Sequence, residues 1–260
     1  MILAVDIGNI RTTIALFHPN GSLSFLSEMG TDRKLTEDQY AIELLDIFRL
    51  YDSEIHSVSG AIISSVVPSM TGVCIAAVQR LTGKVALVVG PGVKTGLNIR
   101  ADVHNQLGSD IVASAVAATA LYPSPVIVIN SHTAVSFSYM KGNTFEGCSI
   151  MPGMGIALEA LSSNGAQLPH ISMGSVDSPL GRNTVDSMRA GIIYGYAGAF
   201  DRLIEQMEEA AGSSAAAVVV TGENFPELLR HCKHSVTYDH DLLVNGLFLI
   251  YKKTTEKFHR

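Results

Sequence analysis

The chain contains no tryptophan, only three cysteines and few charged residues for its length of 260. Charged side chains make up 16% of the sequence, and 24 acidic residues outnumber 18 basic ones, for a formal net charge of −6. Nucleic acids and anionic membrane surfaces are bound through clusters of basic residues. We therefore expect neither as a partner.

Long hydrophobic runs are also missing. No uninterrupted stretch of about 18 apolar residues occurs, so no membrane-spanning helix is predicted. The N-terminus starts with an apolar run and lacks the basic segment of a signal peptide. Cys74, Cys148 and Cys232 form no Cys-x-x-Cys pair, which is typical of reduced thiols. These features predict a cytoplasmic protein.

Nine histidines raise the question of a metal site. His231 and His234 lie close to Cys232, near the end of a predicted helix. The sequence places no carboxylate beside them as a further ligand, so we do not expect a metal there.

Hydrophobic residues are plentiful, at 47% of the sequence, enough for one large domain or two of ordinary size. The chain opens with two apolar, β-branched runs, 2–5 and 12–17, separated by a turn that contains Asp6, Gly8 and Asn9. This order predicts a β-hairpin with a carboxylate at the end of its first strand.

After the hairpin, strands and helices alternate, which indicates a layered α/β domain. The expected elements are a strand at 21–25, a helix at 37–51, a strand at 60–67, a helix at 69–82, a strand at 84–89 and a helix from 110 onward.

The pattern of the opening hairpin occurs a second time, with apolar runs at 126–130 and 133–139 around a short polar turn. A repeated pattern predicts a duplicated α/β core, which we divide into domains of residues 1–123 and 124–260. The second half continues with helices at 154–163 and 185–211, a strand at 217–220, a short extended segment at 235–238 and a closing helix at 242–253.

Polar residues at the ends of these elements permit phosphoryl transfer. Asp6 and Asn130 end corresponding strands, and Asp110 begins a helix. A carboxylate beside a glycine turn can hold Mg²⁺ against nucleotide phosphates, and backbone N–H groups near Gly8 and Asn9 can bind those phosphates. A second carboxylate can accept a hydroxyl proton. Ordinary turn and helix-capping chemistry explains the same residues, and no Walker A motif is present.

The order of several segments resembles the type III pantothenate kinase family of the acetate and sugar kinase/Hsp70/actin superfamily. Together they span nearly the whole chain, and their order is more specific than any one of them. The segments are MILAVDIGNI, PGVKTGL, LGSD, the strand–turn–strand around Asn130, GCSIMPG, GRNTVDSMRAGIIYGY, VVVTG and LLVNGLFLIY.

The resemblance implies a duplicated ribonuclease-H-like, or actin-like ATPase, fold with two similar mixed-sheet domains and a cleft between them. It implies a homodimer with active sites at the subunit boundary. The implied reaction is the ATP-dependent phosphorylation of pantothenate to 4'-phosphopantothenate, the first step of coenzyme A biosynthesis, with Mg²⁺ and a monovalent cation, K⁺ or NH₄⁺.

The resemblance also implies roles for individual residues. Asp6 would bind Mg²⁺ and phosphate, together with Gly8 and Asn9, and Asp110 would be the general base. A monovalent cation would lie beside Asn130. Pantothenate would contact Gly108 and Thr184, and the nucleotide would contact Thr133, Gly153, Thr221 and Gly222.

On the acceptor side, this chain departs from the family pattern twice. Ile111 stands where the family has an arginine for the pantothenate carboxylate, and Ala101 stands where it has a tyrosine. Losing an arginine contact costs about 2 kcal/mol or more unless another group compensates. Arg11 or Arg100 could compensate only if the fold brings one of them there.

On the phosphate and nucleotide side, four positions differ. Ile10 replaces a threonine, Asn130 an aspartate, and both His132 and Glu223 replace glycines. An asparagine brings no charge to a cation, and larger side chains occupy space that glycine leaves to a ligand.

Two alternatives to an active pantothenate kinase therefore remain. One is a non-catalytic paralogue that binds nucleotide or regulates, including as a heteromer with an intact paralogue. Its interface would be the helix at 185–211, where Gly191, Gly195 and Gly198 share one face. The other is a kinase of a different small hydroxylated substrate.

Overall fold

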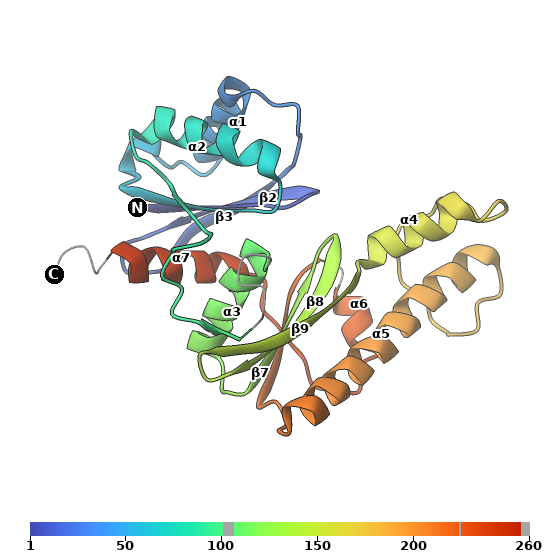
Figure 1. Ribbon diagram of the computed structural model, residues 1–260. Helices are drawn as coiled ribbons and strands as arrows, with labels where there is room; N and C mark the ends of the chain where they lie inside the picture. Colours follow the sequence, from blue (N-terminus) through green and yellow to red (C-terminus); the bar gives the residue numbers. More distant parts are fainter. Residues whose placement is uncertain (101–106, 224, 256–260) are drawn as a thin grey trace. The chain divides into compact units, whose positions relative to one another are not determined.

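The computed structural model describes residues 1–100, 107–223 and 225–255 (Figure 1). The chain divides into two compact units, called unit 1 and unit 2 below. Unit 1 consists of Met1–Leu97, Asp102–Ala120 and Asp241–Arg260, and unit 2 of Asn98–Ala101 and Leu121–His240.

These units are discontinuous in sequence. The C-terminal helix α7, Leu242–Thr255, belongs to unit 1, whereas the division made from the sequence groups it with residues 124–260. The repeated hairpin indicates where the second half of the sequence pattern begins. It does not indicate which unit the C-terminal helix α7 packs in. The limits 1–123 and 124–260 stay a prediction for the duplicated halves and do not coincide with the compact units.

Unit 1 is built on a five-stranded mixed sheet in the order β3-β2-β1-β4-β5. The predicted opening hairpin is confirmed, since β1 pairs antiparallel with β2, and β1 also pairs parallel with β4. The strands are β1 Ile2–Ile7, β2 Arg11–Phe17, β3 Leu23–Gly30, β4 Gly60–Ser65 and β5 Leu87–Val88. The helices, besides α7 and the short 3₁₀ turn Ile55–Ser57, are α1 Glu37–Leu50, α2 Pro68–Thr82 and α3 Ser109–Leu121.

Helices cover both faces of this sheet, and Figure 1 shows α1 and α2 on one side and α7 on the other. Leu3 and Val5 of β1 pack in the core under α1 and α2. Ile2 and Ala4 pack in the second core, with residues of α3 and α7. Because both faces are buried, the strand is a continuous apolar run rather than an alternating one.

Local signals set the limits of the first two helices. Thr36 caps α1, where its hydroxyl accepts a hydrogen bond from the backbone N–H of Gln39, and the Gln39 side chain accepts one from the backbone N–H of Thr36. Helix α2 begins at Pro68 and ends at Gly83, whose φ of 69° lies in the left-handed region that glycine adopts easily. The predicted end of this helix at residue 82 is confirmed.

Helices α3 and α7 approach each other closely. A Cβ atom on Gly246 of α7 would overlap the backbone carbonyl of Ala113 in α3. Apolar and small residues fill most of α3, and eight residues of this helix are buried. This contact holds α3 against α7 within unit 1 and thereby helps to fix the position of Asp110 in the first turn of α3.

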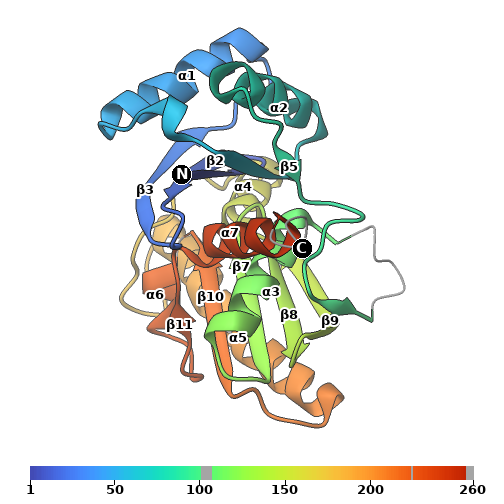
Figure 2. The ribbon, with the colours of Figure 1, turned by 90° about the vertical axis from the view of Figure 1, so that its left-hand side faces the viewer.

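Unit 2 is built on a six-stranded mixed sheet in the order β11-β10-β7-β8-β9-β6, of which Figure 2 labels most strands. The strands are β6 Asn98–Ile99, β7 Val126–Ser131, β8 Ala134–Lys141, β9 Thr144–Pro152, β10 Ala217–Gly222 and β11 Thr237–Tyr238. The helices are α4 Met154–Asn164, α5 Thr184–Ala211 and α6 Phe225–Leu229.

The two sheets repeat one topology. In each, three antiparallel strands are followed by two strands parallel to the first, so β7, β8, β9, β10 and β11 correspond to β1, β2, β3, β4 and β5. Asp6, paired with Ser64, and Asn130, paired with Thr221, occupy equivalent positions of β1 and β7. The predicted duplicated ribonuclease-H-like fold is confirmed, with β6 as an extra edge strand.

Helices α4 and α5 pack on one face of the second sheet. Their core contains a perpendicular aromatic pair, Phe137 of β8 and Phe200 of α5, with ring centroids 4.9 Å apart. Asn183 caps α5 by accepting a hydrogen bond from the backbone N–H of Asp186 at 2.9 Å. Throughout the part of the chain that the structure covers, no helix is both long enough and apolar enough to cross a bilayer.

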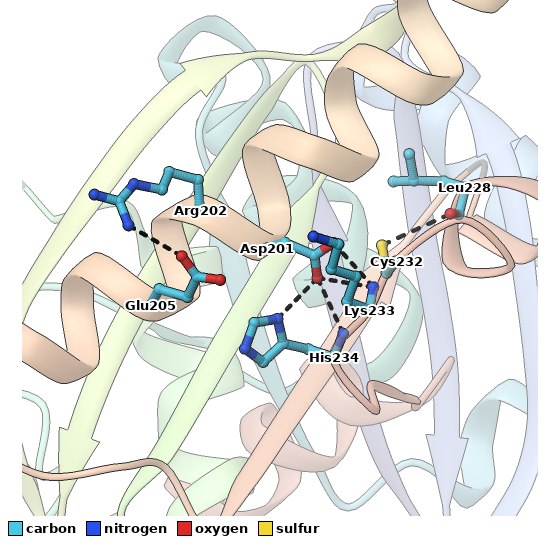
Figure 3. Close-up of polar contacts among 7 residues, drawn as sticks. All are labelled: Asp201, Arg202, Glu205, Leu228, Cys232, Lys233 and His234. Atoms are coloured by element: carbon cyan, nitrogen blue, oxygen red, sulfur yellow. Dashed lines mark hydrogen bonds and ion pairs between the residues drawn. The ribbon is translucent and has the colours of Figure 1, made fainter. Parts of the chain in front are cut away.

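Asp201 of α5 joins this helix to the segment that follows α6 (Figure 3). Its nearly buried carboxylate accepts hydrogen bonds from the backbone N–H groups of Lys233 and His234 at 2.9 and 3.0 Å, and the His234 Nδ1 atom lies 2.8 Å from it. A carboxylate does therefore lie beside His234, which the sequence did not indicate because 33 residues separate the two. No group of three or more metal-binding side chains occurs among the residues described.

We expect the substitution Asp201→Asn to destabilise unit 2 by about 2 kcal/mol at pH 7, because an amide accepts these hydrogen bonds less well than a carboxylate. Burial alone would raise the pKa of Asp201, but the hydrogen bonds from Lys233 and His234 outweigh it and hold the pKa below its usual value. The stabilisation is therefore full above pH 4 and is lost as the pH falls through the lowered pKa.

Denaturant unfolding of both proteins at pH 7 and at pH 3 measures this effect. The control is Glu205→Gln, which breaks an exposed ion pair with Arg202 on the same helix (3.0 Å, Figure 3) and is expected to cost less than about 0.5 kcal/mol. Equal losses in the two variants would contradict the prediction.

Candidate active site

The first candidate residue, Asp6, lies near the end of β1, where its side chain is only 7% exposed. In the described part of the chain, its Oδ1 atom has no hydrogen-bond partner. The pKa of Asp6 is raised to about 7. Burial of the carboxyl group is the largest cause, the negative charge of Asp110 is the second, and a hydrogen bond with Ser64 acts in the opposite direction. Asp6 and Asp110 therefore lie close enough to interact electrostatically.

Asp110 is positioned by the first turn of α3. The Ser109 hydroxyl accepts hydrogen bonds from the Ser64 hydroxyl at 2.8 Å and from the backbone N–H of Ser65 at 3.0 Å. These bonds fasten the start of α3 to the end of β4, the strand beside β1. A Cβ on Gly108 would overlap the Asp110 carboxylate, so glycine leaves the room that this carboxylate needs.

The turn after β1 holds the next two candidates. The backbone N–H of Gly8 donates to the Arg11 carbonyl at 2.9 Å, and a Cβ on Gly8 would lie 2.9 Å from the same oxygen. Asn9 is exposed, and Ile10 is 62% exposed at the tip of the hairpin. The turn thus presents Asn9 to solvent near the end of the strand that carries Asp6.

These residues fit a divalent cation. A buried carboxylate oxygen without a partner, next to a second carboxylate, is an environment that a hard cation would stabilise. In nucleotide sites Mg²⁺ is held by one or two carboxylates and by phosphate oxygens. The Asp6 carboxylate supplies one such ligand.

In unit 2, the candidates Asn130, Thr221 and Gly222 lie at the ends of the neighbouring strands β7 and β10. Thr221 pairs with Asn130, and Gly222 pairs with Ser131. Gly222 has a φ of 107°, and a Cβ there would overlap the Ser131 carbonyl. The backbone N–H of Glu223 donates to the same carbonyl at 3.0 Å. Only glycine fits this turn.

Gly153 and Thr133 join the same end of the sheet. A Cβ on Gly153 would overlap the backbone carbonyls of His132 and Thr133, and the Gly153 N–H donates to the Thr133 carbonyl at 2.9 Å. The exposed His132 ring lies alongside Gly222, since its Cε1 atom would be 3.2 Å from a Cβ there. The imidazole thus lies directly at the turn between β7 and β8.

Asn130 is 2% exposed, and neither its amide oxygen nor its amide nitrogen is hydrogen-bonded to any residue of the described ranges. The equivalent position in unit 1 is Asp6, so each unit holds one buried polar side chain with an unpartnered atom at the same strand position. An amide oxygen can contact a cation but supplies no charge.

Thr184, the remaining candidate, is exposed at the first position of α5. Arg11 forms an ion pair with Glu28 at 2.9 Å, and Arg100 with Glu146 at 3.1 Å, so both arginines that might replace the missing one already have acidic partners. Ile111 itself is 7% exposed and packs as a core residue of α3. Ala101 lies outside the described residues.

Two serines of the site were not predicted. Ser64 and Ser109 fix the distance between β1 and α3, yet they are 45 residues apart and belong to separate motifs. The one available signal was their position, at the end of a predicted strand and directly before Asp110.

The duplicated topology identifies the class of fold. Two solved structures match nearly the whole chain: component A of (R)-2-hydroxyglutaryl-CoA dehydratase from Acidaminococcus fermentans and the ADPNP-bound activator of 2-hydroxyisocaproyl-CoA dehydratase from Clostridium difficile. The first has a TM-score of 0.57 and 11% identity and covers 100% of this chain and 99% of its own. The second has a TM-score of 0.58 and 9% identity, with 99% and 97% covered. The chain has the actin-like ATPase fold.

Sequence comparison defines the family. The model of type III pantothenate kinase matches residues 2–206. The type III pantothenate kinase of Brevibacillus brevis is 36% identical over 97% of this chain and 99% of its own length. That of Listeria monocytogenes is 35% identical over 99% and 100%. The chain belongs to the type III pantothenate kinase family.

Proposed function

We propose that the chain catalyses the ATP-dependent phosphorylation of pantothenate to 4'-phosphopantothenate, the first step of coenzyme A biosynthesis. The observation that carries this proposal is the buried carboxylate of Asp6 beside Asp110, near the turn formed by Gly8 and Asn9, since its Oδ1 atom has no hydrogen-bond partner among the described residues. We propose ATP as the nucleotide and pantothenate as the acceptor because the chain belongs to the type III pantothenate kinase family.

In this proposal Asp110 is the general base. It accepts the proton of the pantothenate hydroxyl while that oxygen forms a bond to the γ-phosphorus, and the bond between the γ-phosphorus and the β,γ-bridging oxygen breaks to release ADP. Bound Mg²⁺ would neutralise phosphate charge, and Asp6 is the residue that would hold it. Gly108 gives the Asp110 carboxylate its space, and Thr184 is assigned to pantothenate.

The turns of unit 2 are assigned to the nucleotide. They bring together small residues and backbone groups that leave room for a ligand against the main chain. Asn130 is the position at which a monovalent cation, K⁺ or NH₄⁺, would bind through an amide oxygen. The residues assigned to the nucleotide are Thr133, Gly153, Thr221 and Gly222.

We also propose that the protein is a homodimer. Gly191, Gly195 and Gly198 lie on the exposed side of α5, and within the described residues no atom would lie within 4 Å of a Cβ at any of them. Such an open strip allows a second helix to approach closely. Light scattering after gel filtration would detect the dimer, and a monomer at micromolar concentration would contradict it.

The test of function is the formation of 4'-phosphopantothenate by the purified full-length chain with Mg²⁺, ATP and pantothenate, with K⁺, NH₄⁺ or neither present. Mass spectrometry identifies the product, and ADP release gives the rate. Turnover that needs both ATP and pantothenate is expected. No turnover with pantothenate, together with no binding of ATP, would overturn the proposal.

A second acceptor is favoured by one observation. Ile111 is buried and apolar where the family has an arginine for the pantothenate carboxylate, so a small hydroxylated substrate without a carboxylate is the alternative. Pantothenol, in which that carboxylate is replaced by an alcohol, separates the two. A higher kcat/KM for pantothenol than for pantothenate would favour the alternative acceptor.

A further inference from the structure

The loop between β3 and α1 folds against the turn that carries Gly8 and Asn9. The backbone N–H of Thr31 donates to the Ile10 carbonyl at 2.8 Å, and the hydroxyls of Thr31 and Thr12 lie 2.9 Å apart. Asp32 turns the chain by accepting a hydrogen bond from the backbone N–H of Lys34 at 2.8 Å. This loop therefore has a defined position beside the turn.

Arg33 is the residue that this loop brings to the turn. Its guanidinium donates a hydrogen bond to the Asn9 Oδ1 atom at 2.9 Å, although the two residues are 24 positions apart. Both side chains are exposed. The neighbouring Arg11 forms an ion pair with Glu28, whereas the side chain that Arg33 contacts, that of Asn9, is neutral.

The charge of Arg33 matters because the known acidic groups of this site repel phosphate. Asp6 and Asp110 are both negative when ionised, and the phosphates of a nucleotide add more negative charge. A guanidinium offers several N–H donors in a planar arrangement that matches phosphate oxygens. Asn9 accepts a hydrogen bond from one of these donors, and the Arg33 side chain is exposed.

We propose that Arg33 is a further phosphate-binding residue of this turn. It orients the Asn9 amide through Oδ1 and places a permanent positive charge where the phosphates of the nucleotide bind. This inference rests on the proposed function, because it assumes that a nucleotide is bound at the turn.

The test compares three ligands, each with Mg²⁺, by calorimetry on the full-length chain: ATP, inorganic tripolyphosphate and adenosine. Arg33→Ala is expected to weaken binding of ATP and tripolyphosphate about 10- to 100-fold, the effect of losing a charged hydrogen bond, and to leave adenosine binding unchanged. Arg33→Lys keeps the charge without the planar fork and is expected to fall between the parent and Arg33→Ala. The matched control is Arg49→Ala, an exposed arginine of unit 1 that pairs with Asp46 at 3.0 Å, and it should stay within about twofold of the parent.

The outcomes separate this inference from the proposed function. A parent protein that turns over pantothenate, with Arg33→Ala binding ATP equally well, overturns the role of Arg33 alone. Equal losses for ATP and adenosine would mean that Arg33 is structural, which also overturns it. A parent protein that binds neither ATP nor tripolyphosphate overturns both. Thermal unfolding checks that each variant is folded, and if Arg33→Ala fails to fold, the comparison of Arg33→Lys with the parent decides.

Discussion

Replacing Asp6 with asparagine is expected to make the protein more stable at pH 8 and to remove its activity. The Asp6 carboxylate is buried, one of its oxygens has no partner within the described ranges, and Asp110 is nearby. Ionising it in the folded state is therefore unfavourable. A neutral amide of the same shape avoids this cost, but it cannot hold a cation as a carboxylate does.

The pH dependence follows from the pKa. The pKa of Asp6 rises from its usual value of 3.8 to about 7 in the folded protein. The folded state then binds the proton more tightly than the unfolded state, so stability is highest below pH 4 and falls as the pH rises to about 7. The whole shift corresponds to roughly 4 kcal/mol, and Asp6→Asn is expected to recover much of it at pH 8 and little at pH 4.

Denaturant unfolding at pH 4 and pH 8 measures this gain, and Mg²⁺-dependent turnover is expected to fall by about 100-fold or more. In the parent protein, MgATP should raise the unfolding temperature at pH 8, and in the variant this shift should disappear. Asp46→Asn, an exposed acid of α1, is the control for removing one negative charge. A variant that is less stable than the parent at pH 8 would show that the carboxylate is stabilised in the free protein.

Replacing Asp110 with asparagine is expected to lower kcat by about 100- to 10,000-fold, the usual contribution of a general base. The KM for ATP should change little, because Asp110 acts on the acceptor hydroxyl. The variant has a second expected effect, since the charge of Asp110 helps to raise the pKa of Asp6. Without that charge the pKa of Asp6 should fall.

Single-turnover kinetics gives the chemical step of Asp110→Asn, and the carboxyl ¹³C chemical shift of Asp6 followed by NMR gives its pKa. Asp110→Glu is the matched variant, which keeps a carboxylate but displaces it, and it should be faster than Asp110→Asn. A variant without the carboxylate that retains more than about a tenth of the parent kcat would mean that Asp110 is not the base.

The sequence predicted the parts of this fold that depend on local patterns. The repeated hairpin led correctly to two equivalent strands, because alternating apolar runs and polar turns are local features. Each strand continues one residue beyond the predicted end, so that Asp6 and Asn130 are next to last. Strand β5 is only Leu87–Val88, shorter than the predicted 84–89, since apolar character alone does not set how far two strands pair. The helix α7 was recognised as a helix, but its amphipathic pattern does not specify which sheet it covers.

The candidate site residues could be predicted from the sequence only where they lie close together in one short motif. Asp6, Gly8 and Asn9 lie in one such motif, as do Gly108 and Asp110. The contacts that position them are made by side chains far apart in sequence, such as Ser64 with Ser109 and Arg33 with Asn9. Pairings of this kind depend on how strands and loops meet in space, which no local pattern encodes.

The membership of α7 in unit 1 has a consequence for synthesis on the ribosome. The strands of the first sheet are made early, but one face of that sheet is completed by residues 242–255, which are translated after the whole of unit 2. Apolar side chains such as Ile2 and Ala4 therefore lack the cover of α7 on a nascent chain while unit 2 already has every strand of its own sheet. The half that carries Asp6 and Asp110 is thus the last to reach its final form, and a chaperone that shields apolar surface would act on it for most of translation.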